Sequence, residues 1–295
     1  MVGMPTVHLI DGHVWIFRAY YVLPHMEAPD GTPTFAAYGF TSTLLKYLAE
    51  TGASHVAMCF DHALTSFRNE LEEGYKADRT EAPPDLEPQF DLCAKAAEVL
   101  GVATYEVPNY EADDVMATLT RQLVARGADV VVVTSDKDLS QLVREDGRVV
   151  IHDNSKGTTL DAEGVRGKFG VDPDQIPDYL GLMGDAIDSL PGVPGVGAKS
   201  AAAILNAFGS IDHIPDDPDA WDGVAVRGAA KLAARVALHR ERALKTRELA
   251  TVVREVPGVS AGLRDVRVRR PDPTRVDALC DRLGWGRLRE RMLQR

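Results

Sequence analysis

The sequence predicts an α/β protein in which a mostly parallel sheet is flanked by helices and followed by a helical C-terminal region. Two observations lead to this fold class. Short apolar runs alternate with helical stretches through the first half of the chain, as in parallel strands joined by crossover helices. After about residue 160 the pattern becomes mainly helical. With 295 residues, the chain can hold one extended domain or a domain with a smaller companion.

The expected elements of the first half follow one another closely. Strands are predicted at 6–11, 54–60, 102–106 and 129–134, and helices near 14–22, 35–51, 85–100 and 111–126. The segment from about 62 to 84 is too long and polar for a plain connection. It indicates either a functional loop or small helical insertion, or a mobile surface excursion.

The expected elements of the second half are helices. They are a helix from Asp172-Pro173 toward Met183, a glycine-rich turn at 192–197, a helix starting at Ala198, a loop at 212–223, and helices at 228–250 and 272–284, with a short strand at 266–269 before the last helix. We place the domain boundary at 170, with domains at 1–170 and 171–295.

Composition and charge limit the class of protein. No run is apolar enough to span a bilayer or act as a signal peptide. The three cysteines are far apart and in no metal-ligand spacing, which favours reduced thiols in a cytoplasm. The net charge is −11, yet residues 225–295 hold 18 Lys and Arg against 8 Asp and Glu. This basic tail suits an anionic partner, although a solvated arginine-rich face explains it equally well.

Acidic residues recur where predicted strands end and helices begin. Asp11, Asp61 and Asp136 each close an apolar run, and parallel strands bring their carboxyl ends to one edge of a sheet. Asp185 and Asp188 would share a helix face if the preceding helix continued that far. The candidate ligands are Asp11, Asp61, Glu111, Asp113, Asp114, Asp136, Asp138, Asp185 and Asp188.

These carboxylates predict a divalent-metal site. Taken singly, each could only cap a helix. Together they would repel one another strongly unless cations lay among them. Because no His or Cys shares their positions, Mg²⁺ or Mn²⁺ is favoured over zinc. Two such ions about 3.5–4 Å apart are typical of phosphodiester hydrolysis.

Two further segments suit a nucleic-acid substrate. In the insertion, basic residues alternate with aromatic ones, an arrangement that can hold a single-stranded backbone and stack bases, or that can be an ordinary surface. Its residues are Phe67, Arg68, Tyr75, Lys76 and Arg79. The turn Gly192-Val193-Pro194-Gly195-Val196-Gly197-Ala198-Lys199 fits a helix-hairpin-helix, whose backbone amides can bind phosphate; a purely structural turn is the alternative.

In this order the motifs resemble those of bacterial and phage 5′-3′ exonucleases and flap endonucleases, which include the amino-terminal domain of bacterial DNA polymerases. They are Leu9-Ile10-Asp11-Gly12, Phe60-Asp61, Ser66-Phe67-Arg68 with Tyr75-Lys76 and Arg79, Tyr110-Glu111-Ala112-Asp113-Asp114, Thr134-Ser135-Asp136-Lys137-Asp138, and Gly184-Asp185 through Gly197-Ala198-Lys199. The resemblance covers nearly the whole chain. With no polymerase module following, we expect a stand-alone enzyme.

The resemblance implies a PIN-like domain over 1–170 with a helical arch near 62–84. It also implies a helix-three-turn-helix that binds duplex DNA near 173–208. The first metal would be bound by Asp11, Asp61, Glu111 and Asp113, with Asp114 adjacent. The second would be bound by Asp113, Asp136, Asp138 and Asp185, with Asp188 directly or through water. One position departs from the family pattern: Ser189 stands where the family usually has asparagine.

The resemblance also assigns roles outside the carboxylates. Lys76 and Arg79 take the transition-state and phosphate-binding positions of the arch, and Arg68 and Tyr75 its substrate-contacting ones. Gly195, Gly197 and Lys199 would meet the DNA backbone. The carbonyls of Val193 and Val196 would hold K⁺.

The resulting hypothesis is a two-metal DNase of replication and repair that leaves 5′-phosphate ends. It would act as a cytoplasmic bacterial monomer without membrane contact. A DNA-junction binding protein with vestigial catalysis and an RNA-directed PIN-type ribonuclease are the alternatives.

Overall fold

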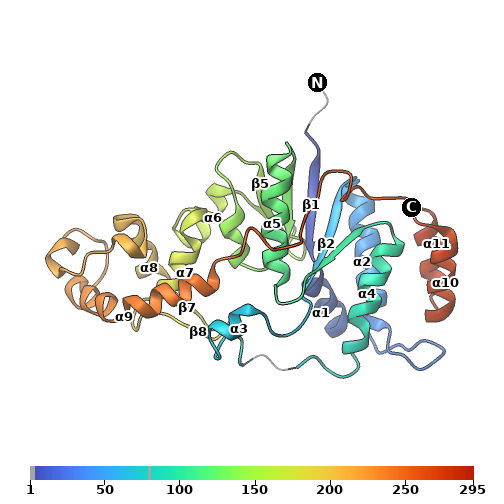
Figure 1. The fold of residues 1–295 in the computed structure, drawn as a ribbon, viewed down its shortest axis with the longest axis horizontal. Helices are drawn as coiled ribbons and strands as arrows, with labels where there is room; N and C mark the ends of the chain where they lie inside the picture. The colour runs from blue at the N-terminus through green and yellow to red at the C-terminus, as the bar shows by residue number, and fades with distance from the viewer. Residues whose placement is uncertain (1–3, 79–80) are drawn as a thin grey trace. The chain divides into compact units, whose positions relative to one another are not determined.

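The computed structural model describes residues 4–78 and 81–295, which group into two compact units (Figure 1). The first unit comprises the described residues of 1–64, 80–135 and 254–295, and the second those of 65–79 and 136–253. This division differs from a boundary at 170. Residues 136–170 group with the helical part, and 254–295 return to the unit that holds the parallel strands.

The first unit is built on four parallel strands in the order β3-β2-β1-β4. They are β1 (Thr6–Asp11), β2 (Val56–Phe60), β3 (Ala103–Glu106) and β4 (Asp129–Val133). Every residue of β2 is buried, as expected for a strand covered on both faces. The alternation of strands and helices therefore predicted this part of the fold correctly.

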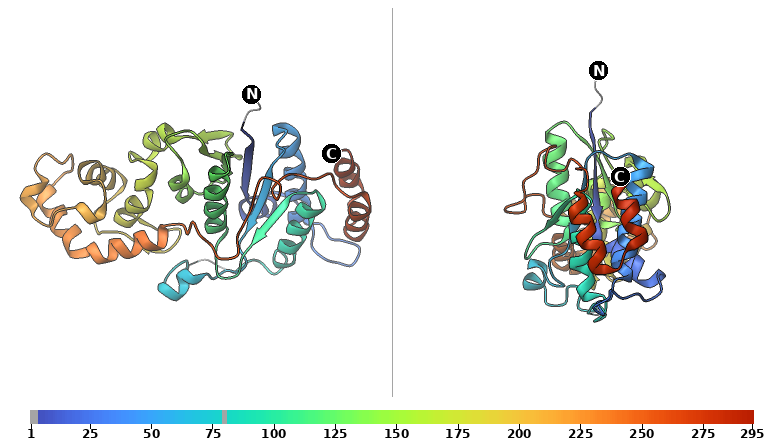
Figure 2. Two further views of the ribbon diagram at one scale, coloured as in Figure 1. Left: turned by 45° about the horizontal axis from the view of Figure 1, so that its top comes forward. Right: turned by 90° about the vertical axis from the view of Figure 1, so that its right-hand side faces the viewer.

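Helices cover both faces of these strands (Figure 1). On one side lie α1 (Gly12–Val22), α2 (Phe35–Thr51) and α4 (Glu87–Val99), and on the other lies α5 (Ala112–Ala125). The last helices, α10 (Pro273–Leu283) and α11 (Gly286–Leu293), lie side by side (Figure 2). They bury Val276, Leu283 and Leu288 in the same core as α2 and α4. The part of the basic tail from residue 254 onward thus belongs to the first unit.

The second unit is mainly helical. It contains α3 (Phe67–Leu71), α6 (Ala162–Phe169), α7 (Ile176–Met183), α8 (Ala198–Phe208) and α9 (Ala229–Ala250), the antiparallel hairpin of β5 (Val149–Asp153) and β6 (Thr158–Leu160), and the short pair β7 (Gly184–Asp185) and β8 (Leu190–Pro191). Its 3₁₀ turns are η1 (Asp138–Leu142), η2 (Pro173–Gln175), η3 (Ile211–His213) and η4 (Pro218–Trp221). Helix α7 packs against both α8 and α9.

The structure corrects the expectation that Asp185 and Asp188 share a helix face. Helix α7 ends at Met183, and Asp185 lies in β7. The cause is Gly184, whose φ of 82° is outside the helical region. A Cβ on Gly184 would lie 2.4 Å from the backbone nitrogen of Gly192, so this crossing also requires glycine.

The strand expected at 266–269 is present only as a single bridge between His55 and Arg267. Two backbone hydrogen bonds flank the bridge, from Val56 N to Val266 O at 2.7 Å and from Val268 N to Ser54 O at 2.9 Å. Among the helices of residues 4–78 and 81–295, none is long and apolar enough to cross a membrane.

Candidate metal centre

Two carboxylates of the first unit follow directly from its parallel strands. Asp11 ends β1 and caps α1, and its carboxylate accepts hydrogen bonds from Val14 N at 3.3 Å and Thr134 Oγ1 at 3.1 Å. Asp61 follows β2, and its Oδ1 accepts a hydrogen bond from Ala112 N at 2.7 Å, at the start of α5. A helix amino terminus favours negative charge, so this contact fixes one oxygen of Asp61.

Contacts with His13 and Phe60 further constrain the surroundings of Asp11 and Asp61. Asp61 N donates to Nδ1 of His13 at 3.1 Å, and this Nδ1 lies 3.7 Å from Asp61 Oδ2. The His13 ring lies among aromatic side chains, with its centroid 5.0 Å from that of Phe90. A Cβ on Gly12 would lie 2.2 Å from the Phe60 ring, so glycine is needed beside Asp11.

The acidic start of α5 supplies three more carboxylates. Glu111 and Asp114 form a reciprocal capping box, in which Asp114 is fully buried and accepts from Glu111 N at 3.2 Å. Asp113 lies near the ends of β1 and β2. Burial raises the pKa of the Cys59 thiol well above its usual value, and the charges of Asp11, Asp113 and Asp61 raise it further. Three of the candidate ligands therefore lie close to one buried thiol.

In the second unit, Asp138 is a strongly perturbed acid. Its Oδ1 is buried and, among the described residues, has no hydrogen-bond partner. Burial raises its pKa to about 8, and the nearby charges of Asp136 and Asp185 contribute to this rise. Asp136 is held beside it, since its Oδ1 accepts from Asp138 N at 2.9 Å. A buried oxygen among like charges is the environment a divalent cation would relieve.

Two lysines lie beside the other two candidate ligands of this unit, Asp185 and Asp188. Lys137 Nζ lies 2.7 Å from Asp185 Oδ2, and the Asp185 side chain is only 4% exposed. Lys76 Nζ lies 3.8 Å from Asp188 Oδ2, which also accepts from the Tyr75 hydroxyl at 3.4 Å. The turn that carries Asp188 includes Ser189, whose hydroxyl donates to Asp78 at 3.1 Å.

The candidate ligands are not already arranged around one metal position. Over residues 4–78 and 81–295, no three Asp, Glu, His or Cys side chains lie together in an arrangement that could hold a metal ion. The chemistry of the donors nevertheless fits hard divalent cations, because the ligand candidates are all carboxylates and one of them has a buried unpartnered oxygen. The nine ligand assignments remain predictions.

The segment expected to form the arch is tied to the second unit at several points. Tyr75 is 3% exposed, and Lys76 N donates to Asp188 O at 3.0 Å. Arg68, expected to contact substrate, is also 3% exposed, and its guanidinium donates to the carbonyls of Leu249 and Thr251. These bonds give Arg68 a structural role, joining α3 to the end of α9. Arg79 lies outside the described residues.

The glycine-rich turn leaves the amino terminus of α8 open. Gly197 caps this helix without a side-chain hydrogen bond, and both Gly197 and Lys199 are exposed. Gly195 has a φ of 81°, and a Cβ there would lie 2.3 Å from the Arg235 guanidinium. Val193 and Val196 are buried, and Val196 N donates to Val193 O at 3.0 Å.

The sequence reasoning missed two residues that hold the carboxylates. His13 supports the backbone of Asp61, and Lys137 pairs with Asp185. The position of Lys137 between two motif aspartates was a signal for such a role. No comparable signal identified His13, because its contact joins residues 48 apart in the chain.

The sequence matches place this fold in a class of nucleases, and the chain belongs to the 5′-3′ exonuclease family. Residues 6–170 match the N-terminal resolvase-like domain of that family, and residues 171–274 match its C-terminal SAM fold.

Its relatives include the DNA polymerase I of Bacillus caldotenax, 38% identical over 288 residues, and that of Mycobacterium leprae, 36% identical over 294 residues. These alignments cover 96% and 98% of this chain but only 32% and 31% of the relatives, so the chain spans about a third of their length.

Solved structures share the fold at lower identity. The bacteriophage T5 D15 protein co-crystallised with metal ions has a TM-score of 0.67 at 19% identity, over 98% of this chain and 97% of that one. The catalytic core of Rad2 in complex with DNA substrate has a TM-score of 0.64 at 16% identity, over 99% and 92%.

Proposed function

We propose that this protein is a divalent-metal-dependent 5′-3′ exonuclease and 5′-flap endonuclease that hydrolyses DNA phosphodiesters in replication and repair. The observation that carries the proposal is the second-unit acidic cluster. There the unpartnered oxygen of Asp138 is buried among the charges of Asp136 and Asp185. Ionisation of Asp138 beside these charges is unfavourable, and a bound divalent cation would relieve it; membership of the nuclease family gives such a cation a catalytic purpose.

The carboxylates of the two units would hold Mg²⁺ or Mn²⁺, two ions or more. Bound ions of this kind activate water and stabilise the leaving oxygen of a phosphodiester, giving 5′-phosphate products. Asp11, Asp61, Glu111 and Asp113 would serve one ion, with Asp114 supporting the start of α5. Asp136, Asp138, Asp185 and Asp188 would serve another. That the T5 D15 protein was co-crystallised with metal ions supports, by analogy, a metal-dependent activity for the shared fold.

Lys76 is the candidate for stabilising charge on the transferred phosphate. Its ammonium group lies 4.9 Å from the centroid of the Tyr75 ring and 3.8 Å from Asp188, so it is held beside the acidic cluster. An ammonium group held next to the scissile phosphate stabilises the developing negative charge. Arg79 would assist from the same segment, and Tyr75 would position Lys76.

The open amino terminus of α8 supports binding of a duplex backbone. Its free amides, the exposed glycines Gly195 and Gly197, and the ammonium group of Lys199 suit phosphate without reading sequence. The carbonyls of Val193 and Val196 would hold K⁺ at this turn. That Rad2 was solved with a DNA substrate supports DNA as the ligand of the shared fold. We expect a monomer in the bacterial cytoplasm.

Product mapping tests this function. A 5′-labelled flap, a nicked duplex and a gapped duplex are incubated with Mg²⁺, with Mn²⁺ and with EDTA, and the product ends are identified. We expect metal-dependent cuts near the flap junction that leave 5′-phosphates. Saturable binding without cleavage in either metal would favour a junction-binding protein, and preferential cleavage of an RNA 5′ strand would favour a ribonuclease.

A further inference from the structure

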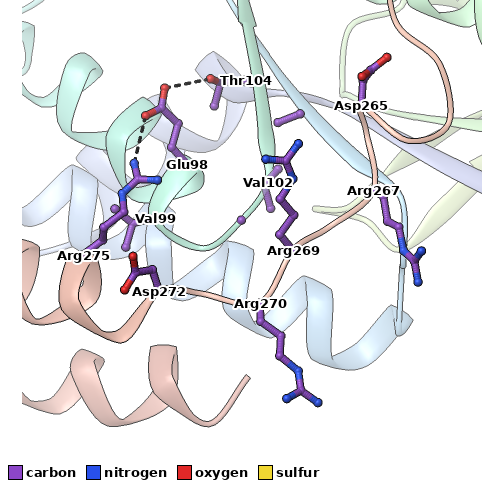
Figure 3. A pocket seen from close by; sticks show the side chains of 12 residues that line it. Glu98, Val99, Val102, Thr104, Asp265, Arg267, Arg269, Arg270, Asp272 and Arg275 are labelled. Carbon is purple, nitrogen blue, oxygen red and sulfur yellow. Dashed lines mark hydrogen bonds and ion pairs between the residues drawn. The ribbon is translucent and has the colours of Figure 1, made fainter.

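An arginine-rich pocket lies in the first unit, at the opposite end of the strands from Asp61. It has a volume of about 280 Å³ and lies between the beginning of β3 and the chain segment that leads to α10 (Figure 3). Its lining includes Arg267, Arg269, Arg270 and Arg275. Nothing in the proposed nuclease site uses these side chains.

The segment that carries the arginines is fixed to the first unit by its backbone. Arg269 N donates to Gly101 O at 2.9 Å, in addition to the bonds that join Val266 and Val268 to the residues around His55. The approach at Gly101 is so close that a Cβ would lie 2.2 Å from Arg269 O. The arginines therefore project from a positioned strand-like segment rather than from a free loop.

The acids around this pocket are already engaged, whereas three arginines are not. Glu98 pairs with Arg275 at 3.7 Å, Asp265 accepts from Gly262 N at 2.7 Å, and Asp272 accepts from Thr274 N at 2.9 Å. Within the described ranges, no ion pair or hydrogen bond involves the guanidinium groups of the three remaining arginines, Arg267, Arg269 and Arg270, and all three are exposed. In Figure 3, Arg269 extends toward Val102, and Arg267 and Arg270 extend away from it.

The residue type and the location suit a phosphate backbone. Residues 254–295 contain eleven arginines and no lysine, and the planar guanidinium binds phosphate through two parallel hydrogen bonds. The pocket adjoins the amino ends of β2 and β3, whereas Asp61 follows the carboxyl end of β2. Five residues of strand separate these ends by roughly 17 Å. Strand β3 stands at the end of the strand order, so no further strand pairs with its outer edge beside this pocket.

We propose that Arg267, Arg269 and Arg270 form a second DNA-backbone site, which holds an arm of the branched substrate away from the cleaved phosphodiester. This inference rests on the proposed function, because it takes branched DNA as the substrate. The contact is sequence-independent and electrostatic. Its signature is the salt dependence of binding, since each phosphate neutralised contributes about −0.9 to the slope of log affinity against log salt.

The test is a fluorescence-anisotropy titration of a 5′-flap DNA in Ca²⁺ across a salt series. The variant R267Q/R269Q/R270Q is compared with the wild type and with R282Q/R287Q/R291Q. The control removes the same charge from exposed arginines of the same tail. We expect the pocket variant to lose about tenfold in affinity and its slope to become shallower by about 2–3, with the control near the wild type.

Each outcome decides between explanations. Equal slopes for the pocket variant and the wild type would overturn the proposal, as would an equal loss in the control. Poly-glutamate is tested as a second ligand. If the pocket variant alone loses binding to poly-glutamate while its salt slope for DNA is unchanged, the partner is an acidic protein, and the proposal is overturned. Matching melting temperatures show that both variants fold. If the wild type neither binds nor cuts flap DNA, the proposed function fails; if it does both, a negative result concerns this arginine site alone.

Discussion

The carboxylates of the two units are stabilised in different ways. In the first unit, Asp61 accepts from the amide of Ala112, and Asp11 accepts from an amide and a threonine hydroxyl. In the second unit, ammonium groups lie against Asp185 and Asp188. Amides orient a carboxylate without cancelling its charge, whereas a lysine both orients and neutralises it.

From this difference we infer which of the two sets of carboxylates depends more on bound cations. The first set has its geometry built into strand ends and a helix start, which the backbone fixes. In the second set, Asp188 lies in a turn that follows the two-residue strand β7. The ammonium groups of Lys76 and Lys137 lie beside Asp188 and Asp185, where a metal ion could replace them. We therefore expect the stability and activity of the second set to respond more strongly to divalent ions, and the first set to depend more on the backbone contacts that hold its geometry.

The largest effect is expected for Asp136→Asn. Asparagine keeps the oxygen that accepts from Asp138 N but removes one charge from the acidic cluster. The rate of flap cleavage should fall by about 10²–10³-fold, the usual result of losing one electrostatic contribution to a transition state, with DNA binding retained. Single-turnover cleavage and a binding titration measure the two quantities. Asp174→Asn, at an exposed aspartate of the same unit, is the control; near-normal turnover of Asp136→Asn would show the metal assignment to be wrong.

A smaller effect, on stability, is expected for Lys137→Met. Asp185 is almost fully buried, so removing its ion partner leaves a charge that is poorly solvated. Without divalent ions the variant should lose about 1–3 kcal/mol, a few degrees in melting temperature. Mg²⁺ should restore more stability to the variant than it adds to the wild type. Lys156→Met removes an exposed ion pair as the control, and an equal response of all three proteins to Mg²⁺ would contradict the comparison.

How far the sequence could predict this molecule depends on the kind of contact. Strands such as β1 and β2 and the long helix α2 were predictable, because periodicity and apolar runs are local signals. The pair of β7 and β8 was not, since the conformation of Gly184 depends on the approach of Gly192. The β5–β6 hairpin and α11 were also missed. Their formation depends on packing that a short window of sequence does not contain.

The same distinction applies to the candidate site. The acidic residues could be selected because motif order and strand ends mark them. The structural role of Arg68 could not, because its partners Leu249 and Thr251 lie about 180 residues further along the chain. A pattern of basic and aromatic residues predicts charge and stacking, but it does not say which guanidinium is already bonded to backbone carbonyls of the folded chain.

In the first unit, the matched pair His13→Leu and His13→Asn tests the geometric half of the comparison. Leucine removes the acceptor of Asp61 N and leaves that amide unsatisfied, at a cost of about 1–3 kcal/mol in unfolding free energy. Asparagine offers an oxygen near the position of Nδ1 and should recover most of the loss. Thermal unfolding in EDTA provides the measurement. If both variants lose the same stability, the His13 ring supports Asp61 through packing alone.

A further expected effect is a change in pH dependence, which follows from the raised pKa of Asp138 in the metal-free protein. In the folded state this pKa is raised to about 8 by burial and by Asp136, whereas in the unfolded chain it is about 3.9. Between these values the folded protein keeps a proton that the unfolded chain releases. The contribution of Asp138 to stability is therefore complete below about pH 4 and is lost as the pH rises through about 8.

The variant Asp138→Asn removes this titration while keeping the shape of the side chain. Its melting temperature in EDTA should rise relative to that of the wild type by a few degrees between about pH 5 and pH 8.5, because only the wild type must bury a charge at the higher pH. Differential scanning calorimetry at several pH values measures the difference. A constant difference across this range would mean that Asp138 is already ionised in the folded protein, which would make the two sets of carboxylates alike in their need for cations.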